Sequence, residues 1–166
     1  LKMAIAGMQN PEKVIWVAHH YGFRNDAFTL NESEVIGVSL GVQGAPNCAI
    51  DRMVVDFAPG QSALCWHPGY ATTALLEELV KTPGLATIEL ERTFDVADST
   101  LTIVVKGNSL FETANVTVLV KQSGIVARQS NGGNDYQHNN APRAFLTSAK
   151  GDELTLDNGN YTATYT

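Results

Sequence analysis

The chain has 166 residues, of which 44% are hydrophobic and 17% are charged, and its formal net charge is −6. This composition is typical of a folded globular protein and excludes an intrinsically disordered one. The net negative charge and the 11 scattered Lys and Arg residues argue against nucleic-acid binding and against a polybasic membrane patch. Because no apolar run approaches the ~20 residues that span a bilayer, we expect no transmembrane helix.

The first half of the chain has the pattern of alternating helices and strands. Helices are predicted over residues 1–8, 31–41 and 71–81, and the second of these begins with a capping-box pattern formed by Asn31 and Glu34. Short apolar runs over residues 14–18 and 48–52 are typical of strands buried on both faces of a sheet, and residues 60–69 are predicted to form a loop. The sequence therefore predicts an α/β module that ends near Pro83.

After Leu85 the hydrophobic period changes from that of a helix to two. Short alternating runs are separated by turn signals at residues 97–99, 107–109, 132–134 and 157–159. Evenly spaced short strands of this kind indicate an antiparallel, immunoglobulin-like β-sandwich. We therefore predict two domains, residues 1–84 and residues 85–166, with almost no linker between them.

The two cysteines, Cys48 and Cys65, are too few for a disulfide-dense scaffold or a cysteine-rich zinc site. Two interpretations remain open. They are either buried small hydrophobic side chains, which is the preferred interpretation, or partners in one mutual disulfide. Neither interpretation fixes the cellular compartment.

Two groups of residues carry a family resemblance. The first is a strand ending in His20, Tyr21 and Gly22, followed by a capped helix and by Gly-Ala-Pro before a strand that closes on Asp-Arg. The second is the segment from Tyr136 to Arg143, which is similar to a Tyr-x-His-Asn-x-x-x-Arg pattern and is followed by a glycine and an acidic residue. Together they resemble the Omp28-related family of Bacteroidetes envelope proteins.

This resemblance implies a thioredoxin-like domain followed by a β-sandwich, in exported and often lipid-anchored proteins of the outer membrane. Members of the family usually carry a Cys-x-x-Cys-Pro segment at the start of the first helix, and no such segment occurs in this sequence. Pro142 also departs from the branched apolar residue that the family tends to have there. We therefore expect an α+β chain made of an N-terminally truncated thioredoxin-like module and a β-sandwich, with an incomplete C-terminal end of the sandwich left open. We expect this chain in the periplasm, at the outer membrane or at the cell surface.

Pro46 resembles the proline that thioredoxin-like folds keep in the cis form beside their redox site. Cys48 follows two residues later, so it would lie near that site. Cys48 has two interpretations, a substrate-facing thiol and a buried strand cysteine, and the second is preferred. A dithiol mechanism needs a second activated thiol within bonding distance, and Cys65 lies in an unrelated predicted loop.

Two further groups of residues are candidates for binding. His20, Tyr21 and Gly22 follow a predicted strand and would shape a ligand-facing loop at its carboxyl end. Tyr136, His138, Asn139 and Arg143 form the second group. In it, His138 and Arg143 could hold an anion, whereas the preferred interpretation is that Asn139 orders a loop and Arg143 pairs with an acidic residue.

The preferred functional hypothesis is a non-catalytic envelope protein with a binding or structural role. Its partner would be an envelope protein or a glycan, it would need no cofactor or metal, and a lost lipid anchor would associate it with the outer membrane. The alternative is a fragment of a thiol–disulfide oxidoreductase whose Cys-x-x-Cys pair lies upstream of Leu1. A metal-dependent hydrolase that uses His19 or His20 is a weaker third hypothesis, because adjacent strand residues point to opposite faces.

Overall fold

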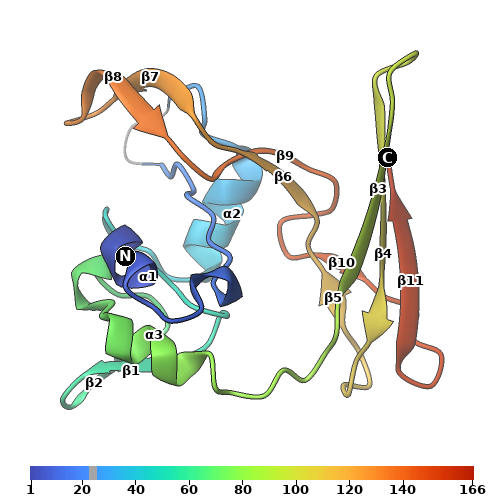
Figure 1. Cartoon of the computed structure of the whole chain (residues 1–166), viewed down its shortest axis with the longest axis horizontal. Helices are drawn as coiled ribbons and strands as arrows, with labels where there is room; N and C mark the ends of the chain where they lie inside the picture. The colour runs from blue at the N-terminus through green and yellow to red at the C-terminus, as the bar shows by residue number, and fades with distance from the viewer. Residues whose placement is uncertain (23–25) are drawn as a thin grey trace. The chain divides into compact units, whose positions relative to one another are not determined.

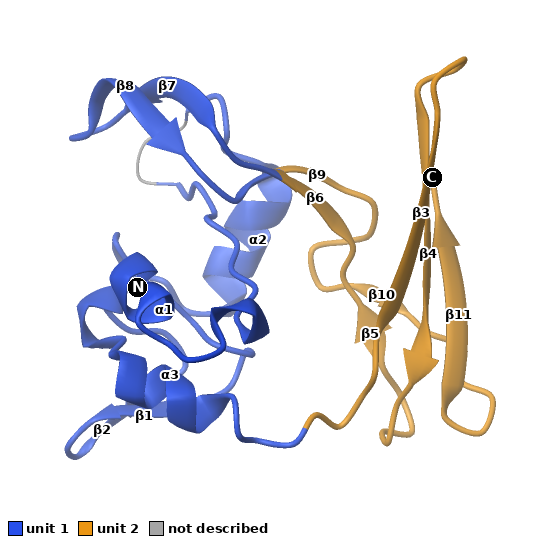
Figure 2. Ribbon diagram, viewed as in Figure 1, with its two compact units in different colours: residues 1–83, 122–142 blue, residues 84–121, 143–166 orange. Residues whose placement is uncertain are grey.

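The computed structural model describes residues 1–22 and 26–166, and these residues form two compact units (Figures 1 and 2). Unit 1 consists of residues 1–83 and 122–142, and unit 2 of residues 84–121 and 143–166. The chain combines a few short helices with mostly antiparallel strands in small sheets, so its class is α+β with a predominance of β structure. Within the described residues, no helix is both long and apolar enough to cross a membrane.

The helices of unit 1 lie where the sequence predicts them, although each is shorter than expected. They are α1 (Lys2–Ala6), α2 (Asn31–Ser39) and α3 (Thr73–Leu79), with two 3₁₀ turns at Pro11–Lys13 and Pro68–Tyr70. At the start of α3, the side chain of Thr72 accepts a hydrogen bond from the backbone N–H of Leu75. This bond satisfies one of the donors that a helix leaves unpaired at its first turn.

The predicted capping box of the second helix is wrong. The N-cap position of α2 is Leu30, and it makes no side-chain capping bond. Asn31 is the first residue of the helix, one position after the N-cap, so its side chain does not occupy the capping position. Glu32 and Glu34 still place negative charge in the first turn, which favours the positive end of the helix dipole.

The two buried strands predicted for the first half are also wrong. Residues 14–18 form no strand, and the backbone N–H of Ala18 donates instead to the carbonyl of Asn140. Residues 48–52 contribute only isolated bridges, because Asp51 and Arg52 both adopt positive φ angles and turn the chain. The strands that unit 1 does contain form two antiparallel hairpins, β1–β2 (Val55–Ala58 and Gln61–Ala63) and β7–β8 (Ile125–Gln129 and Gly133–His138).

Unit 1 is held together by two hydrophobic clusters that share α3 as a neighbour. In the first, Leu76 of α3 packs with Ile5 of α1, with half-buried Trp16 on its border. In the second, Trp66 is 3% exposed, and Leu75 and Leu79 of α3 pack on this cluster. Burial of such side chains supplies most of the stabilisation of a short-helix fold, since helices of this length are marginal in isolation.

Unit 2 is built on a three-stranded antiparallel sheet in the order β11–β4–β3 (Asn160–Tyr165, Thr100–Asn108 and Glu89–Asp95). A second small sheet pairs β5 (Asn115–Val116) with β10 (Asp152–Glu153). The core contains Val105, which is fully buried, together with Val116, Val118, Leu154 and Tyr161. The alternation of this half of the sequence is thus confirmed as antiparallel strand structure, although the predicted turn at residues 107–109 is wrong because β4 continues through Asn108.

Strands β6 (Leu119–Gln122) and β9 (Ala141–Phe145) pair with each other, and along each of them the chain passes between the two units. The segment of residues 122–142, which contains the β7–β8 hairpin, belongs to unit 1. Pro142 stands in the middle of β9 and is almost completely buried. A two-stranded sheet tolerates a proline there, because each strand has one unpaired edge.

Candidate functional site

Two segments that the sequence separates widely meet inside unit 1. The ring centroids of His20 and His138 are 5.1 Å apart, and Phe28 lies 5.2 Å from the first ring and 4.6 Å from the second. Tyr136 packs edge-on against His138 at 5.0 Å. With Asp26, these residues form what we call the histidine cluster.

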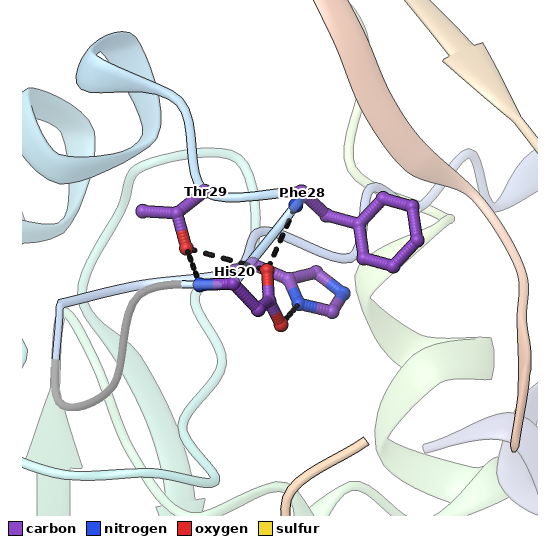
Figure 3. Close-up of polar contacts among 4 residues, drawn as sticks. His20, Phe28 and Thr29 are labelled. Atoms are coloured by element: carbon purple, nitrogen blue, oxygen red, sulfur yellow. Dashed lines mark hydrogen bonds and ion pairs between the residues drawn. The ribbon is translucent and has the colours of Figure 1, made fainter. Parts of the chain in front are cut away.

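Asp26 organises one side of the histidine cluster through hydrogen bonds with His20, Phe28 and Thr29, the three residues labelled in Figure 3. Its Oδ2 accepts a hydrogen bond from Nδ1 of His20 at 2.7 Å, and its Oδ1 accepts one from the backbone N–H of Phe28 at 2.8 Å. The Thr29 hydroxyl closes the turn by accepting from the Asp26 N–H at 3.0 Å. A carboxylate that bonds the backbone two residues later is a common way to fix a turn. Here the same side chain also fixes the tautomer of His20.

The surroundings of Asp26 act on its charge in both directions. Partial burial raises the pKa of Asp26, but the hydrogen bonds from Phe28, His20 and Thr29 outweigh that effect and hold the pKa below its usual value. The carboxylate is therefore ionised at neutral pH and serves as a fixed acceptor for His20.

His138 is the most enclosed member of the histidine cluster. It is 3% exposed, and among the described residues its Nε2 atom has no hydrogen-bond partner. An unpaired buried polar atom costs about 1–3 kcal/mol, so such an atom is unusual in a folded protein. The rings of Phe28, Tyr136 and His20 account for the position of the imidazole by packing.

A pocket of about 440 Å³ lies in the same unit and also involves β8. Because successive strand residues point to opposite faces, Gln137 faces away from Tyr136 and His138. The polar and aromatic lining of the pocket comes from Lys2, Trp16, Ser123, Gln137, Asn139 and Asn140. Ile5 and Ala6 of α1 complete the wall. We call this the unit 1 pocket.

The loops that carry the pocket residues are held by hydrogen bonds. Oδ1 of Asn139 accepts from the backbone N–H of Gly124 at 3.1 Å, and the backbone N–H of Asn140 donates to Oγ of Ser123 at 2.9 Å. Asn140 has a φ of 57°, a left-handed conformation that asparagine tolerates better than most residues. Asn139 thus ties the two ends of the β7–β8 hairpin to each other, in the manner of the loop-ordering role expected for it.

Arg143 belongs to a different unit from the rest of its predicted group. It lies in β9, is exposed and belongs to unit 2, whereas Tyr136, His138 and Asn139 belong to unit 1. The proposed anion site of His138 and Arg143 stays a prediction.

Tyr21 and Gly22 lie beside α2. A Cβ atom built on Gly37 of that helix would be 2.6 Å from the Tyr21 ring, so the ring packs directly on the backbone of α2. Gly22 is exposed. Tyr21 therefore contributes to packing at this loop, and His20 is the member of the triplet that joins the histidine cluster.

His19 has a role separate from that of its neighbour. Its Nδ1 atom lies 2.9 Å from Oγ of Ser33, which is 1% exposed and belongs to α2. Desolvation, and to a smaller extent the charges of Arg52 and His20, lower the pKa of His19, so its neutral form is favoured. The described residues contain no group of three or more His, Cys, Asp or Glu side chains arranged to hold a metal ion.

The peptide bond between Ala45 and Pro46 is cis, which is the form that the resemblance implies for this proline. Cys48 forms an antiparallel bridge with Trp66, and both Cys48 and Cys65 are free thiols. Burial raises the pKa of Cys48 to about 11, with a smaller contribution from Cys65, and burial also raises the pKa of Cys65. Both thiols are therefore protonated at neutral pH and are poor nucleophiles there.

Comparison of the chain with protein-family models, with curated proteins and with solved structures finds no match. The function proposed for the chain therefore rests on the geometry of the sites described above.

Several residues of these sites were not identified from the sequence. Phe28, Lys2, Gln137 and Trp16 carry no sequence pattern that predicts a role in binding. A turn signal was available for Asp26, since Asp and Thr three residues apart often bond each other's backbone. No comparable signal exists for the unit 1 pocket, because its residues come from segments that only the tertiary fold brings together.

Proposed function

We propose that this chain is a non-catalytic binding protein of the bacterial cell envelope and that the unit 1 pocket holds its ligand. The chemistry of the pocket lining carries this proposal. The lining offers amide groups, one hydroxyl, one ammonium group, one indole and two aliphatic side chains. These groups donate and accept hydrogen bonds and provide apolar contact. Lys2 and Ser123 are of residue types that can act as a base or a nucleophile, but among the described residues the lining places no histidine or carboxylate beside them to activate either one.

The volume of the pocket supports a small-molecule ligand. Pockets that bind small molecules usually measure about 300–1,000 Å³, and they combine apolar walls with a few well-placed polar groups. At about 440 Å³, the unit 1 pocket falls within this range. The resemblance of the His20–Gly22 and Tyr136–Arg143 segments to an envelope family supports an exported protein, associated with the outer membrane or the cell surface.

Thiol–disulfide exchange is the alternative function, and the state of the two thiols opposes it for this chain. An attacking thiol works best when its pKa is near the ambient pH. The pKa of Cys48 is about 11, so only a very small fraction of it is thiolate at pH 7. An oxidoreductase would therefore need the pair of cysteines expected upstream of Leu1.

A thermal-shift screen of the purified chain tests the proposal. Ligands that bind only the folded state raise the unfolding temperature, and the shift grows with the ratio of ligand concentration to Kd. We expect at least one of three panels, neutral saccharides, free amino acids or nucleosides, to raise Tm in wild type and to raise it less in a Gln137→Ala variant.

Two results would contradict the proposal. One is the absence of any shift with all three panels at millimolar concentration. The other is reduction of insulin disulfides by the chain with dithiothreitol as the reductant, at a rate that depends on Cys48.

A further inference from the structure

We propose that the ligand of the unit 1 pocket is a neutral saccharide, bound with one pyranose face against Trp16. This inference rests on the proposed function and names the ligand class for the same site. It is drawn from three features of the pocket, namely an anchored indole, a set of amide groups and a near absence of charge.

The indole of Trp16 is positioned by the hydrophobic core. Trp16 is half-buried and packs on the cluster of Ala4, Ile5, Met8 and Leu76, and it also lines the pocket. One part of its ring system therefore fixes it to the core while another part is available to a ligand. A pyranose carries C–H groups on one face, and these pack well on the electron-rich face of an aromatic ring.

The polar lining has the hydrogen-bonding character that sugar hydroxyls require. Each sugar hydroxyl both donates and accepts, and the amides of Gln137, Asn139 and Asn140 also contain both kinds of atom. Ser123 adds a hydroxyl that already accepts from the N–H of Asn140, so its position is fixed. Because Asn139 is anchored to Gly124, little ordering is needed when the ligand binds.

The charge of the pocket disfavours phosphorylated ligands and free amino acids. A nucleotide would need several cationic groups around its phosphates, and Lys2 is the single cation in the lining. A free amino acid would need a carboxylate to pair with its ammonium group, and the lining residues are amides, a hydroxyl and apolar groups in addition to Lys2. A neutral saccharide makes neither demand, and Lys2 can donate to one of its oxygens.

Tryptophan fluorescence and its quenching can measure binding directly. The probes are glucose, galactose, mannose, N-acetylglucosamine and maltose, each titrated into the intact chain. We expect a saturable change in emission with at least one of them. Trp16→Ala should abolish binding and Trp16→Tyr should retain it, both measured by thermal shift because the fluorescent reporter is removed. Gln137→Ala should weaken binding about fivefold, the loss expected for one hydrogen bond.

Ile15→Ala is the matched control. Ile15 is next to Trp16 in the chain and is 82% exposed, so this substitution should leave both folding and binding unchanged. If Trp16→Ala fails to fold, the comparison of Gln137→Ala with wild type still decides the question, because Gln137 is an exposed residue of β8.

The outcomes separate this inference from the proposed function. If amino acids or nucleosides bind in a Gln137-dependent way and no saccharide does, the saccharide inference is wrong and the binding function stands. If no probe of any class binds, both are wrong. Saccharide binding that is unaffected by Trp16→Ala and Gln137→Ala would also overturn the inference, because the sugar would then occupy another site.

Discussion

The carboxylate of Asp26 accepts three hydrogen bonds. It bonds the His20 ring, the Phe28 backbone and the Thr29 hydroxyl, and these bonds outweigh its partial burial and hold its pKa below the usual value. A carboxyl group with a lowered pKa contributes stability that is present above its unfolded pKa and is lost as the pH falls through its folded pKa.

Replacing Asp26 with asparagine tests this contribution. An asparagine can still accept from the Phe28 N–H, but it carries no charge to lose. We expect wild type to lose stability as the pH falls below about 4, and Asp26→Asn to lose less over the same interval. Urea unfolding between pH 5 and pH 3 measures the difference. Parallel loss in both proteins would show that Asp26 contributes nothing specific.

His19 should produce a second, separate pH dependence. Because its pKa is lowered in the folded state, the unfolded chain takes up a proton first as the pH falls below about 6.5. Stability should therefore be full above that pH and should decrease as the pH falls from about 7 toward 5. His19→Gln should flatten the decrease in this interval, and Asp26→Asn should leave it intact. An unchanged slope in His19→Gln would refute the assignment.

The thiol of Cys48 gives a prediction that bears on function. With a pKa of about 11, its alkylation by iodoacetamide should be slow at pH 7 and should rise steeply with pH toward that value. A Cys65→Ser variant isolates the reaction of Cys48. A rate that reaches its plateau below pH 8 would mean an activated thiol, and would move the oxidoreductase hypothesis ahead of the binding one.

At the level of elements, the contact between Tyr21 and α2 makes Gly37 a sensitive position. Alanine is the better helix former by about 1 kcal/mol, but a Cβ at Gly37 would be 2.6 Å from the Tyr21 ring. We expect Gly37→Ala to destabilise the protein by about 1–3 kcal/mol, because the clash outweighs the helix propensity.

A double-mutant cycle separates these two effects. In a Tyr21→Ala background the clash is absent, so Gly37→Ala should become neutral or stabilising. Val38→Ala is the control, since Val38 is on the same helix and is 70% exposed. If Gly37→Ala were equally destabilising in both backgrounds, contact with Tyr21 could not be the cause.

The elements also show where sequence patterns are informative. The helices were predicted from periodicity, and the turn at residues 157–159 from its residues, because Asn158 and Gly159 both adopt the positive φ angles that such residues tolerate. The strand predicted at residues 14–18 failed because an apolar run indicates burial without indicating a pairing partner. In the structure, Val14 and Trp16 border a hydrophobic cluster from an irregular segment.

The same reasoning explains what could be foreseen of the candidate sites. His20 and the Tyr136–Arg143 segment were selected for their chemistry, but their sequence positions gave no sign that His20 and His138 would lie together. Residues 133–138 carry no clear alternation of apolar and polar side chains, so the separation of Gln137 from its two neighbours follows only from the observed strand β8. Trp16 was predicted to lie in a strand. Its place in a pocket could not be predicted, because the β7–β8 hairpin region supplies the other lining residues.

At the scale of the whole molecule, the division into two units depends on contacts between segments that are distant in the sequence. The hydrophobic periodicity of the sequence does not predict these contacts. The first passage of the chain from unit 1 to unit 2 is at Pro83 and Gly84, close to the boundary predicted from the change of period. The later passages, at residues 121–122 and 142–143, leave no comparable mark, because they fall within strands β6 and β9 and not at a change of period. The thioredoxin-like and immunoglobulin-like assignments of the two halves stay predictions.

This division is what gives unit 1 its pocket. Ser123, Gln137, Asn139 and Asn140 all come from the 122–142 segment, whereas Lys2 and Trp16 come from the beginning of the chain. The binding proposal therefore depends on the association of these two segments within one unit.

The most direct test of that proposal uses the two tryptophans of the intact chain. Trp16 lines the unit 1 pocket and Trp66 is buried in a separate cluster, so their indole N–H signals in a ¹⁵N–¹H spectrum report on the pocket and on the core. Titration with the neutral saccharide that gives the largest thermal shift should move the Trp16 signal together with the side-chain amide signals of Gln137 and Asn139, and leave that of Trp66 in place. Spectra in which no saccharide, amino acid or nucleoside moves the Trp16 signal would contradict the account.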